Sequence, residues 1–208
     1  MARLWSNDRR SPERCPSGMA WVRDIPVTEE PMLRKIVLAH DGSDHADKAL
    51  DLAITLAKAT DSELEIVNVL SDQSLTQDEL TLAETEYGAA MHQGLGDLKL
   101  VPLGGAPWIG TAALVQTRPE LSPTVRRVLG EQIVRQAAAT ATTKGVARVT
   151  TAVESGDPAS AIVRRAQETR ADLVMLGSRG LGNIKGLLLG SVSNKVVSMA
   201  ECSVVTVK

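Results

Sequence analysis

The sequence DLVMLGSRGLGNIKGLLLGSVS, residues 172–193, decides the fold of this chain. Its first five residues are almost all apolar, which is typical of a strand that is covered on both faces of a sheet. A glycine-rich loop follows, after which Val192–Ala200 predicts a helix and Ser203–Val207 a last strand. This order of strand, glycine loop, helix and strand predicts a parallel sheet with the loop at the carboxyl end of one strand.

The same alternation extends toward the N-terminus. Apolar, β-branched runs predict three more strands, at Lys35–His40, Leu64–Leu70 and Val146–Val153. Apolar residues at helical spacing predict helices after the turn Asp41-Gly42-Ser43, at Val125–Lys144 and at Ala159–Thr169. Five strands that alternate with four helices predict an α/β fold, an open and mostly parallel sheet with helices on both faces. The pattern leaves the strand order open.

Composition divides the chain into an extension, a domain and an insert. Residues 1–33 are rich in proline, arginine and other charged residues, which predicts a flexible or loosely docked N-terminal extension. Residues 34–208 form one predicted domain, interrupted by a long insert at about 71–123. Within the insert, the polar segment Gln73–Glu86 could hold a short helix, and the sequence predicts no definite structure for Gly88–Gly110. A segment of this length is typical of a lid, an interface or disorder.

Charge and composition exclude several classes of partner. The net charge of −2 and the aromatic content of 2%, with no phenylalanine, argue against a nucleic-acid partner. No apolar run approaches the roughly 20 residues that a membrane-spanning helix needs, so no membrane partner is expected. Cys15 and Cys202 lie far apart and have no metal-ligand spacing, which favours a reducing, cytoplasmic location.

The glycine loop has the chemistry of a phosphate site. Its spacing is Gly177-x2-Gly180-x9-Gly190-Ser191, and glycines let backbone amides approach an anion closely. The helix that begins at Gly190-Ser191 offers unpaired amides and the positive end of its dipole, and Ser191 and Ser193 could add hydroxyl donors. The loop is neither a Walker loop nor a dinucleotide fingerprint. The alternative interpretation is a plain surface turn.

Four segments of the sequence resemble motifs of the universal stress protein family and occur in the same order as in that family. They are Ile36–Ser43 with its Asp-Gly-Ser turn, Gly156-Asp157-Pro158, the loop within Leu173–Gly190, and the ending Cys202–Val207. The resemblance covers residues 34–71 and about 124–208. It implies a flavodoxin-like sheet with strand order 3-2-1-4-5, and a homodimer that commonly pairs its last strands. It also implies a stress-response or regulatory role with bound ATP, with or without Mg²⁺.

The resemblance also implies a set of nucleotide-binding residues. Asp41 matches the acid that contacts the adenosine moiety, whereas Ala39 and Val69 match walls of the adenine pocket. The ribose and phosphates would contact the glycine loop and the start of the last helix, at Gly177, Arg179, Gly180, Gly190, Ser191, Val192 and Ser193. Asp-Gly-Ser is also good turn chemistry, so a purely structural role for Asp41 stays open.

Three departures from the family pattern stand out. The insert at 71–123 is longer than usual, Ser203 replaces a usual proline, and His40 replaces a usually apolar residue beside the predicted adenine pocket. The three histidines form no cluster, and the sequence predicts no catalytic residue and no metal ligand. Two alternatives remain beside a nucleotide-binding regulator: a weak Mg²⁺-dependent ATPase, and a nucleotide-free dimeric scaffold that uses the insert as its interaction surface.

Overall fold

The computed structural model describes residues 33–71, 75–88, 91, 115–116, 121–181 and 189–208. Their centre is one sheet in which every strand pairs in parallel, in the order β3-β2-β1-β4-β5. The strands are β1 (Lys35–Ala39), β2 (Glu63–Leu70), β3 (Val149–Ser155), β4 (Leu173–Gly177) and β5 (Ser203–Val207). The predicted fold class and the implied strand order are both confirmed.

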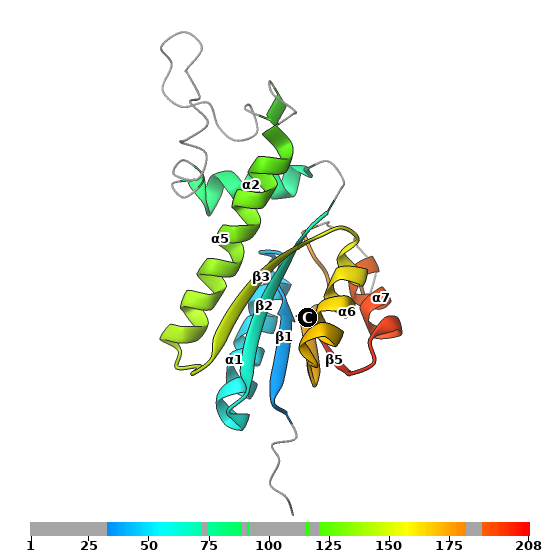
Figure 1. Ribbon diagram of the computed structural model, residues 1–208. Coiled ribbons are helices and arrows are strands. Elements are labelled where there is room, and N and C mark those ends of the chain that lie inside the picture. Colours follow the sequence, from blue (N-terminus) through cyan, green and yellow to red (C-terminus); the bar gives the residue numbers. More distant parts are fainter. Residues whose placement is uncertain (1–32, 72–74, 89–90, 92–114, 117–120, 182–188) are drawn as a thin grey trace, which may run out of the picture. The chain divides into compact units, whose positions relative to one another are not determined.

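Helices cover both faces of this sheet, as Figure 1 shows. Those with a complete description are α1 (Asp44–Thr60), α2 (Gln77–Thr85), α5 (Ser122–Thr143), α6 (Pro158–Thr169) and α7 (Ser191–Met199). Because successive strand residues point to opposite faces, Ile36 and Leu38 pack against α1 and α5, whereas Val37 packs against α6 and α7. The result is the expected three-layer arrangement, with an apolar core on each side of the sheet.

A third apolar cluster joins the insert to α5. It contains Leu82 and Ala83 of α2 and the buried face of the first half of α5, with Val125, Val128, Leu129 and Ile133. The predicted short helix within Gln73–Glu86 is present as α2, and it begins at a capping box formed by Thr76 and Glu79. Most of the remaining insert lies outside the described residues, as does the predicted extension apart from Leu33.

The largest difference between a predicted and an observed strand boundary lies at the start of β3. The predicted strand Val146–Val153 begins at Val149 in the structure, because Val146 is part of the capping structure that follows α5. Its amide donates to the carbonyl of Ala141 at 3.1 Å, and Gly145 before it takes a left-handed conformation with φ +91°. This arrangement ends the helix and buries Val146, so that its apolar side chain is not a strand signal.

Candidate nucleotide-binding site

A cavity of about 360 Å³ opens at the carboxyl ends of β1, β2 and β4. This is where ligands bind in open parallel sheets, because the chain leaves neighbouring strands in different directions there. The structure brings all ten predicted site residues to the wall of this cavity: Ala39, Asp41, Val69, Gly177, Arg179, Gly180, Gly190, Ser191, Val192 and Ser193. Their contact with a nucleotide stays a prediction.

Asp41 connects the turn after β1 to the glycine loop. Its Oδ1 accepts a hydrogen bond from the amide of Ser43 at 3.0 Å, and its Oδ2 accepts one from the amide of Leu181 at 3.1 Å. A Cβ on Gly180 would lie only 2.4 Å from that Oδ2, so the close approach of loop and carboxylate requires glycine. Asp41 therefore positions the glycine loop and also faces the cavity.

The side chain of His40 stabilises the same turn. Its Nδ1 accepts a hydrogen bond from the amide of Gly42 at 3.2 Å, and its Nε2 lies 3.2 Å from Oδ1 of Asp47 on α1. The carbonyl of His40 accepts from Nδ2 of Asn68 at 2.8 Å. Both ring nitrogens are thus engaged in interactions within the protein, and the side chain stabilises the turn that carries Asp41.

The first turn of α7 presents open amides to the cavity. The amide of Gly190 donates to the carbonyl of Ser178 at 2.7 Å. The amides of Ser191, Val192 and Ser193 donate to no acceptor within the described residues. Unpaired amides at a helix N-terminus carry partial positive charge and are well suited to an anionic group.

The hydroxyl of Ser193 has a different role from the predicted one. Ser193 is 2% exposed, and its Oγ donates to the carbonyl of Ser178 at 2.8 Å. The hydroxyl proton thus helps to fasten α7 to the chain that follows β4, which leaves the backbone amide as the donor for a ligand. Ser191, in contrast, is exposed at the cavity wall. Residues 182–188, between these two parts of the loop, lie outside the described residues.

Sequence reasoning missed the opposite wall of the cavity. Thr76 and Glu79 of the insert and Arg126 of α5 line it, beside Leu129 and Gly130. Arg126 is only 8% exposed, although arginine is seldom buried without a partner. The available signal was an arginine within an otherwise apolar helical stripe, but its meaning depends on how α5 packs.

The described residues contain neither a cluster of metal ligands nor a helix that could span a membrane. No group of three or more histidine, cysteine, aspartate or glutamate side chains in the described part of the chain could hold a metal ion. None of the helices described there is both long and apolar enough to cross a lipid bilayer.

Known sequences resemble this chain over most of its length. A model of the universal stress protein family matches residues 32–208. The universal stress protein YxiE of Bacillus subtilis is 31% identical over 177 residues, which are 85% of this chain and 100% of the relative. A putative universal stress protein of Staphylococcus aureus is 28% identical over 177 residues, covering 84% of each chain.

Solved structures show the same fold. The universal stress protein UspA from Lactobacillus plantarum superposes with a TM-score of 0.53 at 20% identity, covering 85% of this chain and 98% of its own. A universal stress protein solved in complex with cAMP superposes with a TM-score of 0.50 at 23% identity, covering 84% of this chain and 96% of its own. At sequence identities of 20% and 23%, this structural similarity shows a shared fold and nothing more specific.

Proposed function

The chain belongs to the universal stress protein family, and we propose on this basis that it is a cytoplasmic stress-response protein that binds ATP in the cavity described above. The observation that carries the proposal is the first turn of α7. Three consecutive amides there have no acceptor within the described residues and open onto the cavity wall. A polyphosphate supplies the anionic oxygens that such amides bind.

The rest of the cavity suits the nucleoside part of the ligand. Ala39 and Val69, at the ends of β1 and β2, are partly buried and apolar, and they line the cavity together with Leu176 and Ile162. Apolar walls of this kind accept the faces of a base, and Asp41 between them and the loop offers a carboxylate to ribose hydroxyls. One universal stress protein of similar fold was solved with cAMP, which supports an adenine nucleotide as the class of ligand.

The test is a calorimetric titration of the full chain with ATP, with and without Mg²⁺. Ser191→Glu places a carboxylate beside the open amides. The negative charge interacts favourably with the helix dipole and so stabilises the helix, but it repels phosphate. We expect ATP affinity to fall by about tenfold or more, which is a loss of about 1.4 kcal/mol or more in binding free energy. The melting temperature of the free protein should stay equal or rise slightly.

The matched control is Ser198→Glu, which adds the same charge at an exposed position near the other end of α7. It is expected to leave ATP affinity unchanged. Equal ATP affinity in wild type and Ser191→Glu would reject the phosphate site, and no ATP binding by wild type would reject the function.

The proposal includes a homodimer. Among the described strands β5 pairs with β4 alone, so its other edge presents backbone groups that can pair with a second strand. Light scattering after size-exclusion chromatography should give twice the 22.1 kDa of one chain. The mass of a single chain at micromolar concentration would contradict the dimer.

A further inference from the structure

We propose that Arg126 and Glu79 form a base-reading pair, which binds the polar edge of adenine at the end of the cavity opposite the phosphates. This inference rests on the proposed nucleotide site and names the residues that would select its base. It assigns part of the binding site to α2, within the insert, and to α5, which directly follows it.

Arg126 is a buried cation, and two of its nitrogens have no hydrogen-bonding partner in the described part of the chain. Arg126 is 8% exposed, and neither its Nε nor its Nη2 has a hydrogen-bond acceptor among the described residues. Arginine keeps its charge when buried, and leaving charged donors unsatisfied there costs considerable free energy. Because the side chain lines the cavity, an acceptor on a ligand is the natural partner for these donors.

Glu79 supplies an acceptor beside these donors. Its Oε2 accepts from the amide and hydroxyl of Thr76, at 2.6 Å and 3.0 Å, so this oxygen is committed to the capping box. Its Oε1 lies 3.9 Å from Nε of Arg126, which is too long for a hydrogen bond. Among the described residues, the wall therefore presents a donor without an acceptor beside a carboxylate oxygen for which no hydrogen bond is recorded. Their charges offset, which suits a neutral polar group better than a second phosphate.

Adenine offers the complementary pattern. Each polar edge of the base carries a ring nitrogen that accepts next to the exocyclic amino group that donates. Arg126 would donate to the ring nitrogen, and Oε1 of Glu79 would accept from the amino group. Asn68 adds a further acceptor, because its Nδ2 is bonded to His40 while its Oδ1 lies beside Gly130, one helical turn beyond Arg126.

The sheet sets the distance between the two ends of the cavity. Arg126 and Glu79 lie on the side of β2, against which α5 packs, whereas the glycine loop follows β4. β1 lies between β2 and β4, so the two ends are separated by two strand spacings, roughly 10 Å. This separation suits a nucleotide whose phosphates lie at the amides of α7 and whose base extends toward α5.

The experiment compares ATP, GTP and inorganic tripolyphosphate on the full chain by calorimetric titration. Arg126→Met keeps the length of the side chain but removes its donors. We expect ATP affinity to fall by about tenfold or more, whereas tripolyphosphate affinity stays unchanged. Arg127→Met is the matched control, since Arg127 is the adjacent residue of α5 but is exposed and bonded to Glu131 at 2.9 Å. It should leave both affinities unchanged.

A melting curve separates binding from a structural role. Because Nε and Nη2 of Arg126 have no hydrogen-bond acceptor among the described residues, and its ion pair with Glu79 is long at 3.9 Å, Arg126→Met should melt at or above the wild-type temperature without ligand. It should also gain less stability from ATP. Lower stability with full ATP affinity would overturn the inference, as would an equal loss of ATP and tripolyphosphate binding. GTP bound as tightly as ATP by wild type would overturn the adenine assignment. Failure of wild type to bind ATP would instead reject the function on which the inference rests.

Discussion

At the scale of the residue, Tyr87 reports how the insert packs. It follows α2 and lies half-buried against the third apolar cluster. Burial raises the pKa of Tyr87 to about 12, and the negative charges of Asp47 and Glu86 act in the same direction. Tyr87 is also the only tyrosine of the chain, so its ionisation can be followed without interference from another phenol.

We therefore predict that the phenol of Tyr87 ionises near pH 12 in the folded protein, and near its ordinary value of 10.0 in concentrated urea. Because the folded pKa is raised, the stability that neutral Tyr87 contributes is complete below pH 10 and is lost as pH rises toward 12. Near-ultraviolet absorbance of the phenolate measures both titrations. Coincident curves would show that Tyr87 is not packed against the domain.

At the scale of the element, α5 approaches β2 through a glycine. A Cβ on Gly130 would lie 2.6 Å from Oδ1 of Asn68 and 2.7 Å from Cδ2 of Leu70, closer than real Cβ contacts allow. Asn68 also donates to the carbonyl of His40, so the contact lies next to the turn that carries Asp41. The position of α5, and with it the wall that contains Arg126, depends on the small size of residue 130.

Overpacking in Gly130→Ala is therefore expected to cost about 1–3 kcal/mol of stability. Alanine gains about 1 kcal/mol over glycine inside a helix, so we expect a net destabilisation of up to about 2 kcal/mol. Urea unfolding followed by circular dichroism measures the change. Gly88→Ala is the control, since nothing lies within 4 Å of its Cβ, and it should be neutral or stabilising. A more stable Gly130→Ala protein would contradict the close approach.

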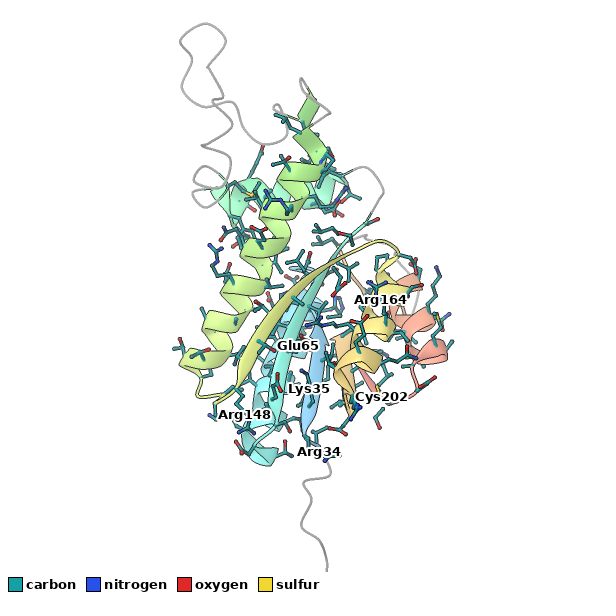
Figure 2. All side chains as sticks on the ribbon, viewed as in Figure 1. Arg34, Lys35, Glu65, Arg148, Arg164 and Cys202 are labelled. Atoms are coloured by element: carbon teal, nitrogen blue, oxygen red, sulfur yellow. The ribbon has the colours of Figure 1, made fainter. Side chains whose placement is uncertain are left out.

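At the scale of the whole molecule, a buried carboxylate joins the sheet to α6. Glu65 of β2 is 2% exposed and accepts hydrogen bonds from Arg165 of α6, one of them from Nε at 3.0 Å. Lys35 of β1 lies on the same face, with its Nζ 3.3 Å from Oε2 of Glu65, and Figure 2 shows the two side chains on adjacent strands. The hydrogen bond to Glu65 raises the pKa of Arg165, which is consistent with a tightly held pair.

Arg165→Met should lower the free energy of unfolding by about 2 kcal/mol. The loss is smaller than the roughly 3–5 kcal/mol typical of a broken buried pair, because Lys35 remains beside Glu65. Arg164→Met is the control on the same helix, since the side chain of Arg164 is 50% exposed and its bond to Glu154 lies at the surface. It should change stability by less than about 1 kcal/mol. Equal midpoints of urea unfolding for the two variants would contradict the role of Glu65.

The sequence by itself determined the elements, their order and the end of the cavity that the glycine loop forms. Local features encode these, since β-branched runs, helical spacing and turn glycines act within a few residues of one another. Asp41, the Gly177–Gly180 bend and the Gly190-Ser191 helix start follow directly from this local pattern, and all of them line the cavity. The strand order came from the family resemblance and not from periodicity.

Only the tertiary structure showed which residues form the end of the cavity opposite the glycine loop. It also showed which hydrogen-bonding partners several polar side chains have. Arg126 and Glu79 meet because α2 packs on α5, and no local pattern specifies a contact between two segments so far apart in the chain. His40 and Ser193 are similar cases, since their hydrogen bonds go to α1 and to the segment after β4. Spacing in the sequence predicts which backbone amides are unpaired, but the partner of a polar side chain depends on which elements the fold brings against it.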